Sequence, residues 1–298
     1  MENISKFKIW FLASRPKTLP AAVAPIIIGL AMAYSDNKSI NCLTAVLTLV
    51  CAVLIQVGTN FANDYFDFVK GTDNNKRIGP KRATQNGLVS KKEMKFAFLM
   101  TFAIAALLGI VLVIKGGWPI LIIGILAIIF GILYTAGPMP LAYVGLGDIF
   151  VFIFFGIVAV CGTYFLQAFK ITLSVFIASL APGLLSAAIL TSNNLRDENN
   201  DRLSGKRTVV VRLGYRFGSY EYLFCIIAAN IIPFIIIIIT KNYFFILLSL
   251  ISLIFAIKPL RIVLSHPDPL KLMPVLQITA AVLMVYSIFF SIGYNIFL

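Results

Sequence analysis

Long apolar stretches set the strongest limit on what this chain can fold into. A hydrophobic share of 60%, a charged share of 12% and a mean hydropathy of +0.95 give the 298 residues more apolar surface than a soluble domain of this length can bury. Most stretches are long enough to cross a bilayer of about 30 Å as helices of about 20 residues, which satisfy their backbone polar groups inside lipid. We therefore expect an all-α, polytopic membrane protein of about nine spans, forming a single domain over residues 1–298. The predicted spans begin near Leu19, Leu43, Phe96, Trp118, Ile149, Ile171, Tyr222, Tyr243 and Met273.

Lysine and arginine residues are divided very unevenly between the two sides of the predicted bundle. Of the 25 Lys and Arg residues, 21 fall on the amino terminus and on the loops after spans two, six and eight. The opposite side carries only Lys38, Lys115, Lys170 and Lys241. Because cytoplasmic loops collect positive charge, this division predicts a cytoplasmic amino terminus and an outer carboxyl terminus. Topology and contact with anionic lipid then explain the net charge of +13, and we expect no binding of nucleic acid.

Two clusters of acidic residues stand out in a chain with only 12 Asp and Glu residues. One runs from Asn60 to Asp67 at the end of span two, and the other runs from Asn193 to Asp201 at the end of span six. Carboxylates at the edge of hydrocarbon are costly to desolvate, so they indicate a bound cation, a phosphate held through a cation, or a proton pathway. Both clusters fall on the predicted cytoplasmic side, where they can meet in one site.

The spacing within each cluster suits a hard metal ion. If span two stays helical to its end, Asn60, Asp64 and Asp67 lie at i, i+4 and i+7 along one stripe, and span six repeats this spacing. Carboxylate and amide oxygens without His or Cys are typical ligands of Mg²⁺, which takes one or two carboxylates together with phosphate oxygens and water. The candidate metal ligands are Asn60, Asn63, Asp64, Asp67, Asn194 (or its neighbour Asn193), Asp197 and Asp201.

Each acidic cluster leads into a basic loop, and the two loops share a spacing. The first reads Arg-Ile-Gly-Pro-Lys-Arg over residues 77–82, and the second reads Arg-Leu-Ser-Gly-Lys-Arg over residues 202–207. The match hints at a duplicated four-helix unit, and we expect the loops at about 60–93 and 193–216 to form a cytoplasmic cap. Basic side chains beside metal-binding acids are the groups that hold a diphosphate. The candidate diphosphate-binding residues are Arg77, Lys81, Arg82, Lys206, Arg207 and Lys17.

Two other interpretations of the acidic clusters remain open at this point. The clusters could be incidental acids in positively charged cytoplasmic loops. They could instead couple protons or ions in a secondary transporter, although such proteins bind their ions near the membrane midplane between inverted repeats. The position of both clusters on one side, next to basic loops, favours a metal and a diphosphate.

At these residues the chain resembles the UbiA superfamily of intramembrane prenyltransferases, over nearly its whole length. Members carry an Asn-Asp-x-x-Asp motif after the second helix, here at residues 63–67, and a second Asp-rich motif after the sixth. Gly71 stands where many relatives have a third aspartate, which fits the branch that prenylates 1,4-dihydroxy-2-naphthoate. The segments most similar to that branch are residues 15–21, 63–73, 79–90 and 205–214.

The resemblance implies nine helices around a central cavity in the bacterial cytoplasmic membrane, with the active site at the cytoplasmic face. It implies transfer of a polyprenyl group from polyprenyl diphosphate to 1,4-dihydroxy-2-naphthoate, with loss of carbon dioxide, to give demethylmenaquinone. Mg²⁺ held by the four aspartates of the two clusters would neutralise the diphosphate and let the allylic C–O bond ionise. Alternatives within this class are another aromatic acceptor, such as 4-hydroxybenzoate, and farnesylation in haem synthesis.

Aromatic rings and isolated polar residues complete the list of candidates. An allylic cation is stabilised by the faces of aromatic rings in a dry cavity. Tyr134 and Tyr143 flank the Gly-Pro-rich loop after span four and are the candidates for this role. Asp148 fits a position at a helix amino terminus as well as it fits acceptor binding, and His266, in a proline-rich turn, is left out of the site. The acceptor's carboxylate needs a positive partner from elsewhere, because the loop after span four contains no Lys or Arg.

Overall fold

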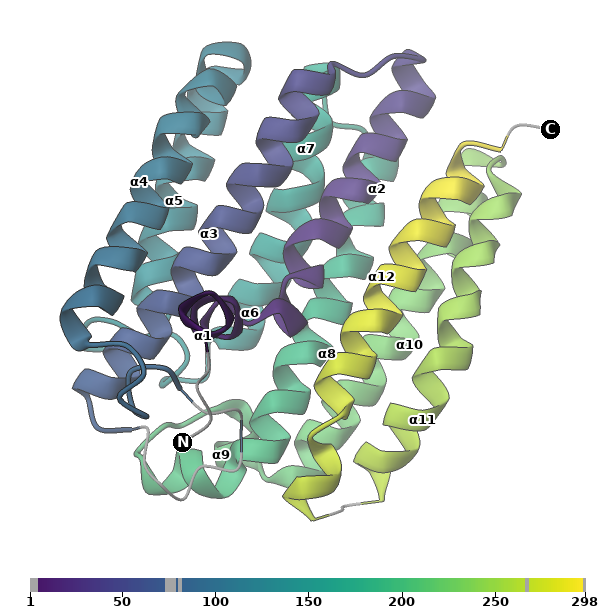
Figure 1. Cartoon of the computed structure of the whole chain (residues 1–298). Helices are drawn as coiled ribbons and strands as arrows, with labels where there is room; N and C mark the ends of the chain where they lie inside the picture. Colours follow the sequence, from purple (N-terminus) through teal and green to yellow (C-terminus); the bar gives the residue numbers. More distant parts are fainter. Residues whose placement is uncertain (1–4, 73–78, 80–81, 266–267, 297–298) are drawn as a thin grey trace.

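Long helices run side by side along a common axis and make up nearly the whole molecule (Figure 1). This computed structural model describes residues 5–72, 79, 82–265 and 268–296. Within these residues the chain contains no β-strand. The helices are α1 (Lys6–Ala13), η1 (Pro16–Thr18), α2 (Pro20–Asn37), α3 (Cys42–Val69), α4 (Lys91–Gly116), α5 (Trp118–Leu133), α6 (Gly147–Phe152), the π-helical η2 (Ile153–Val158), α7 (Ala159–Ala168), α8 (Leu173–Leu203), α9 (Val209–Leu213), α10 (Tyr215–Thr240), η3 (Phe244–Ile251), α11 (Ser252–Leu264), η4 (Pro269–Leu272) and α12 (Val275–Tyr294).

The apolar stretches expected from the sequence are helical, but not all of them have the length of a full span. Within the described part of the chain, seven helices are long and apolar enough to cross a membrane, and the bent pair of residues 6–18 and 20–37 makes an eighth. α5 has 16 residues, a length of about 24 Å, which is shorter than the hydrocarbon core. The expectation of an all-α membrane protein is confirmed, while the count of nine spans and the orientation of the termini stay predictions.

Polar side chains fix where the helices around the cavity begin. Asn41 caps α3 by accepting the backbone N–H three residues on at 3.0 Å, and Thr172 caps α8 in the same way at 3.3 Å. Ser90 and Glu93 form a reciprocal capping box at the start of α4. The caps on α3 and α8 set the register of the two helices whose far ends carry the acidic clusters.

α8 is the central helix of the bundle. It is the most buried of the long helices, and it packs against α2, α6, η2, α7, α10 and α12. Gly156 of η2 meets Gly183 of α8, where a Cβ added to Gly156 would lie only 2.7 Å from the Gly183 Cα. Small residues at such a crossing let two helices approach closely. The crossing holds the segment that begins with α6 against the helix that carries the second acidic cluster.

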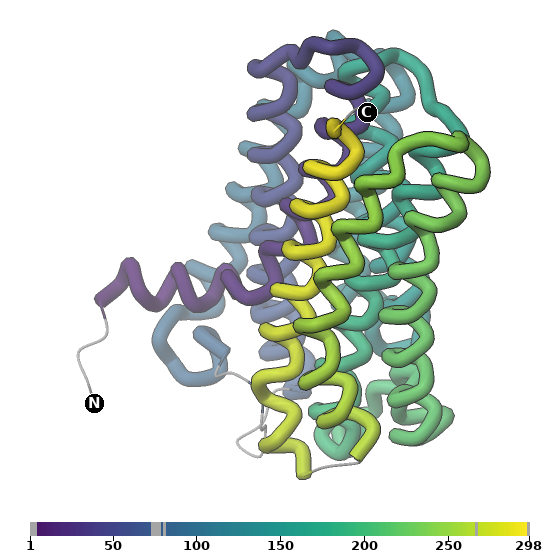
Figure 2. Tube along the Cα trace, turned by 90° about the vertical axis from the view of Figure 1, so that its right-hand side faces the viewer, coloured from purple at the N-terminus to yellow at the C-terminus, as the bar shows by residue number. Residues whose placement is uncertain are grey.

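The amino-terminal helix α1 lies across the bundle rather than along it (Figure 2). The chain bends by 56° between residues 6–18 and α2. Trp10 packs edge-on against Phe61 of α3, with ring centroids 5.5 Å apart, while Phe7 is 80% exposed. The Asn60 side chain donates to the Ser14 carbonyl at 2.9 Å. The bend is therefore fastened to α3 beside the first acidic cluster, and an apolar face of α1 is left for lipid.

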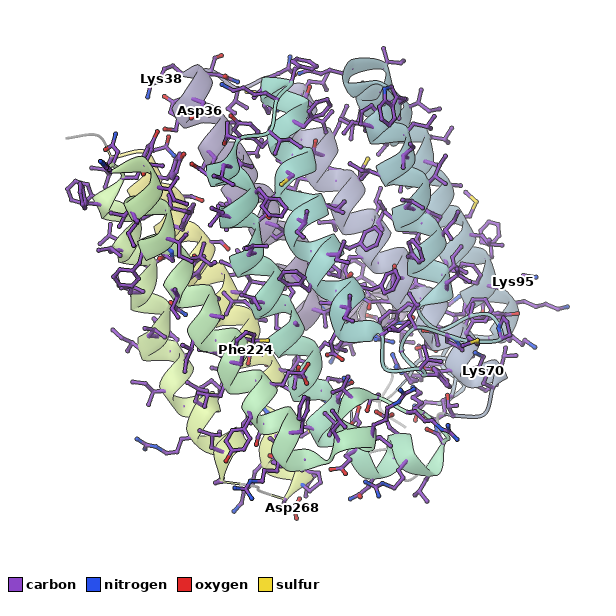
Figure 3. The ribbon with its side chains drawn as sticks, turned by 180° about the vertical axis from the view of Figure 1, so that it is seen from behind. Asp36, Lys38, Lys70, Lys95, Phe224 and Asp268 are labelled. Carbon is purple, nitrogen blue, oxygen red and sulfur yellow. The ribbon has the colours of Figure 1, made fainter. Side chains whose placement is uncertain are left out.

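The ends of α3 and α8 that carry the acidic clusters lie at the same end of the bundle (Figure 1). Lys70 and Asp268 lie toward this end, and Asp36 and Lys38 lie at the opposite end (Figure 3). The two clusters can therefore share a site, as the sequence predicts. Which end of the bundle faces the cytoplasm stays a prediction.

Candidate active site

A cavity of about 940 Å³ inside the bundle joins both acidic clusters to a long apolar interior. Its apolar wall comes mainly from α4, α5, η2 and α7, and includes Leu107, Ile128 and Phe154. The charged residues that line its other end are Asp67, Arg82, Asp197, Asp201 and Lys206. A cavity with a charged end and an apolar interior suits a ligand that has an ionic head and a hydrocarbon tail.

Only some of the predicted metal ligands of the first acidic cluster line the cavity. Asp64 is 2% exposed and is not one of the lining residues. Its Oδ2 accepts the N–H of Ala83 at 2.9 Å, and its Oδ1 accepts the N–H of Thr84 at 3.1 Å. In this structure Asp64 anchors the loop that follows α3, and its role as a metal ligand stays a prediction. The members of the cluster that line the cavity are Asn60, Asn63 and Asp67.

Asp67 is the point where the two halves of the site meet. Its buried carboxylate accepts a hydrogen bond from the Tyr143 hydroxyl at 2.7 Å and one from the Thr72 hydroxyl at 3.3 Å. Arg82 Nη2 lies 3.3 Å from one carboxylate oxygen, and Lys206 Nζ lies 3.4 Å from the other. Lys206 belongs to the second basic loop, 139 residues further along the chain. The structure thus brings the two predicted basic loops to the same acid.

Tyr143 holds two lysines next to Asp67. The Nζ atoms of Lys70 and Lys206 lie 4.7 and 4.8 Å from the centre of the Tyr143 ring. Lys70 also donates to the Thr135 carbonyl at 2.7 Å. Burial lowers the pKa of Lys70, and the charge of Lys206 also lowers it, while Asp67 raises it. The two lysines held beside Asp67 can serve as cationic partners for an anion that enters this end of the cavity.

The second acidic cluster is held by a buried arginine. Arg196 is 4% exposed and donates to both oxygens of Asp197, at 2.8 Å from Nε and 2.6 Å from Nη2. The same Nη2 donates to Asn193 Oδ1 at 2.6 Å. Arg196 is not among the predicted site residues, because adjacent opposite charges in a sequence give no sign that the pair is buried. The members of this cluster that line the cavity are Asn193, Asn194, Asp197 and Asp201.

Only some of the predicted diphosphate-binding residues line the cavity. Arg207 and Lys17 are exposed and do not line the cavity. The backbone N–H of Arg207 donates to the Tyr143 carbonyl at 2.8 Å, so this residue joins two loops through its main chain. The predicted residues that do line the cavity are Arg82 and Lys206. Those outside the described residues are Arg77 and Lys81.

Arg15 is a cation of the cavity wall that was not among the predicted site residues. It stands between α1 and η1 with a φ of 53°, a left-handed conformation that is uncommon for residues other than glycine. Such strained positions are concentrated at functional sites, where the surrounding structure holds them. A weak signal is present in the sequence, because Arg15 precedes Pro16 and the residue before a proline avoids the right-handed helical region.

Tyr134 and Asp148 lie in the same part of the cavity wall. Both line the cavity, and a Cβ added to Gly147 would lie 3.3 Å from the Tyr134 hydroxyl. A tyrosine phenol is neutral at physiological pH, so Tyr134 presents an uncharged ring to the cavity. The position of the neutral ring fits the predicted role of Tyr134 beside an allylic cation, which stays a prediction.

The oxygen ligands at the charged end fit Mg²⁺ that is bound together with a phosphate. Within the described residues, no three Asp, Glu, His or Cys side chains form a ready-made metal cage. Mg²⁺ in proteins usually keeps several waters and takes one or two carboxylates plus substrate phosphates. Carboxylates on two facing helices suit that mode of binding. The cavity-lining oxygen donors are Asp67, Asp197, Asp201, Asn60, Asn63 and Asn194.

These observations define a class of protein: a helical membrane bundle whose inner cavity receives an anionic head at one end and an apolar chain beyond it. The chain belongs to the UbiA prenyltransferase family, whose model matches residues 22–273. The resemblance seen in the sequence is thereby confirmed, and the protein is a prenyltransferase. The family model spans both acidic clusters and the cavity-lining residues between them.

Two relatives are similar over nearly their whole length. The chain is 38% identical to the 1,4-dihydroxy-2-naphthoate octaprenyltransferase of Escherichia coli (strain K12), covering 98% of this chain and 96% of that protein. It is 32% identical to the protein of the same name from Mycobacterium tuberculosis, covering 96% of each. A solved structure, that of a UbiA homolog from Archaeoglobus fulgidus bound to GPP and Mg²⁺, matches with a TM-score of 0.67 over 95% of this chain and 99% of that chain. At 16% identity this last match supports the fold alone.

Proposed function

We propose that this prenyltransferase transfers a polyprenyl group from polyprenyl diphosphate to 1,4-dihydroxy-2-naphthoate, with loss of carbon dioxide, to give demethylmenaquinone. The observation that carries the proposal is the cavity with two charged loops at one end and an apolar interior, in a chain 38% identical to an enzyme named for that acceptor. A polyprenyl tail stays in the bilayer, because each buried CH₂ contributes about 0.8 kcal/mol. The bacterial relatives and the charge division support a site at the cytoplasmic face of the cytoplasmic membrane.

The diphosphate fits the charged end of the cavity. Arg82 and Lys206 pair with Asp67, and Arg196 pairs with Asp197, so these cations have partners within the protein. A diphosphate offers these cations stronger partners, which frees carboxylate oxygens. Mg²⁺ bound to those oxygens and to the diphosphate would neutralise the charge that develops on the leaving group.

The hydrocarbon chain fits the apolar part of the cavity, where water is excluded. Tyr134 lies at the end of α5, lines the cavity and is within electrostatic range of Asp67 and Asp201, so its ring can face the allylic carbon of a diphosphate bound at the charged end. The face of its neutral ring stabilises positive charge on that carbon. A dry cavity also protects the cation from capture by water.

Arg15 supplies the positive partner that the acceptor's carboxylate needs. It is followed by Thr18, whose hydroxyl accepts a hydrogen bond from Asn60 at 3.3 Å, and both line the cavity. Asn60 lies seven residues before Asp67 on α3. The part of the cavity beside Asn60 and Arg15 is therefore about 10 Å deeper in the bundle than Asp67. A guanidinium binds a carboxylate through two parallel hydrogen bonds, so an acceptor held here would present its ring to the prenyl carbon.

The test uses the protein purified in detergent, a polyprenyl diphosphate and an equimolar mixture of 1,4-dihydroxy-2-naphthoate and 4-hydroxybenzoate. With Mg²⁺ we expect one product, whose mass is that of the prenylated naphthalene diol without its carboxyl group, and with EDTA we expect none. Asp201→Asn should lower the rate at least about 100-fold, since it removes a charge from the metal and diphosphate site. Asp268→Asn is the control, because Asp268 is an exposed helix cap that asparagine can replace. Prenylation of 4-hydroxybenzoate alone, or of neither acceptor, would contradict the proposal.

A further inference from the structure

Asp148 is a buried carboxylate in the cavity wall. The proposed binding of the diphosphate assigns it no role. It stands at the start of α6 and is 8% exposed. Its Oδ1 has no hydrogen-bond partner among the described residues. By contrast, Asp64, Asp67 and Asp197 are also buried, and each accepts at least two hydrogen bonds. A buried carboxylate with an unpaired oxygen costs stability, so folding alone does not explain it.

The groups that face Asp148 come from three other elements. Thr191 of α8 is a neighbour of Asp148, but its hydroxyl donates to the Ala187 carbonyl at 2.9 Å, and Tyr134 lies close to Asp148 at the end of α5. Glu221 and Cys225 of α10 are its other titratable neighbours. None of these neighbours is a cation, and no ion pair of Asp148 is present in the part of the chain that the structure describes.

The depth of Asp148 matches the position of an acceptor ring. Thr191, its neighbour on α8, lies six residues before Asp197, which puts it about 9 Å deeper than that acid. Arg15 lies at a similar depth, and Tyr134 is within electrostatic range of both Arg15 and Asp148. A ring whose carboxylate binds Arg15 therefore lies near Tyr134, where Asp148 is available as the acceptor for a ring hydroxyl.

We propose that Asp148 is the acid–base residue of the reaction: it takes the proton of the ring hydroxyl next to the prenylated carbon and later returns it. The inference rests on the proposed function and names a further residue of the same site. The geometry that carries it is a buried carboxylate on the cavity wall, with an oxygen unpaired among the described residues, close to the buried ring of Tyr134.

The chemistry balances with this one residue. The ring carbon that bears the carboxylate bonds to the allylic carbon with an electron pair of the ring. The diphosphate leaves, and the neighbouring hydroxyl gives its proton to Asp148 and becomes a ketone. When the C–CO₂⁻ bond then breaks, its electron pair forms an enolate, and the protonated Asp148 returns the proton to that oxygen. One diphosphate and one carbon dioxide leave, Asp148 ends as it began, and no oxidant or reductant is needed.

The first test compares Asp148→Asn and Asp148→Glu with the wild-type enzyme in steady-state kinetics. General acid–base groups contribute about 100-fold or more, so we expect kcat of Asp148→Asn to fall at least about 100-fold, with the KM for the polyprenyl diphosphate unchanged within about twofold. Asp148→Glu should recover part of the rate. The thermal midpoint of Asp148→Asn should be unchanged or higher, because the substitution removes a buried charge. Asp268→Asn is again the control.

The second test uses acceptors whose ring hydroxyl is more acidic, such as ring-halogenated 1,4-dihydroxy-2-naphthoates. A hydroxyl that ionises more readily depends less on a base, so the ratio of wild-type to Asp148→Asn rates should shrink as the acidity of the hydroxyl rises. The folded fraction of the variant changes every ratio by the same factor, so the trend across acceptors does not depend on it. Absence of product from the wild-type enzyme would overturn the proposed function and this inference with it. Normal product from the wild-type enzyme, with an equal rate in Asp148→Asn or a flat trend, would overturn this inference alone.

Discussion

Replacing Asp64 by asparagine tests whether this residue anchors the loop after α3, as the structure shows, or binds a metal ion, as the sequence predicts. The substitution keeps the shape of the side chain but replaces one carboxylate oxygen by an NH₂ group. In the structure both oxygens accept backbone N–H groups, from Ala83 at 2.9 Å and from Thr84 at 3.1 Å. Asparagine can accept only one of them and presents a donor to the other. Hydrogen bonds to charged groups contribute about 1.5–3 kcal/mol each, so the loss of one, with a buried N–H left unpaired, should weaken the loop by about 3 kcal/mol.

Hydrogen exchange of the loop amides measures this weakening directly. A loss of about 3 kcal/mol corresponds to about 100-fold more frequent opening, since each 1.4 kcal/mol is a factor of ten. Exchange of the peptide that contains Ala83 and Thr84 should therefore be about 100-fold faster in Asp64→Asn. Asp268→Asn is the control, because Asp268 is an exposed helix cap whose side chain bonds within its own helical turn, and exchange at these amides should stay within about threefold of wild type.

Two results would refute the reasoning about Asp64. The first is wild-type protection of the two amides in Asp64→Asn. The second is faster exchange of the same amides in the wild-type enzyme on addition of Mg²⁺ and a diphosphate, which would mean that the carboxylate leaves the loop to bind the metal, as the sequence predicts.

Three further outcomes follow from the packing and charges of the site. Lys206→Met removes the cation that joins the second loop to the first acidic cluster, so the KM for polyprenyl diphosphate should rise at least about tenfold in steady-state assays, while Lys170→Met at the other end should change nothing. Gly156→Ala forces a Cβ to within 2.7 Å of the facing helix and should lower stability by about 1–3 kcal/mol in thermal unfolding, whereas Gly109→Ala, with open space around it, should not. Burial lowers the pKa of Lys70 in the folded protein below its ordinary value of 10.5, so the unfolded chain binds this proton more tightly. The free energy of unfolding should therefore rise as the pH approaches 10.5, and this rise should be smaller in Lys70→Gln.

Much of the architecture could be predicted because it depends on composition along the chain. Apolar stretches in lipid can only be helices, so the sequence locates the helices well. The unequal division of Lys and Arg predicts that both acidic clusters lie at one end, and the pairing of Lys206 with Asp67 agrees with it. The count of spans is less certain from sequence, because α1 turns across the bundle and α5 is short.

The details of the site could not be predicted, because they depend on the rotation of helices and the path of loops. A helical stripe chosen by spacing can be wrong by one position, and Asp64 in this structure faces loop amides that are 19 and 20 residues away in sequence. Arg15 reaches the cavity through a left-handed turn that the sequence barely signals. Asp148 fitted two roles equally well from sequence, and its burial and its unpaired oxygen are properties of the packed structure.

The shortness of α5 has a consequence for the membrane around it. Trp118 at its amino end is 73% exposed, as expected for a residue anchored at the membrane interface. A helix of about 24 Å that starts there ends about 6 Å before the opposite interface of a 30 Å core. Local thinning of the bilayer is one way to accommodate a short span, and we expect the hydrocarbon layer to be thinner outside the bundle beside α5. A lipid whose diphosphate has to pass from the interface to the cavity meets the smallest hydrophobic barrier at this place.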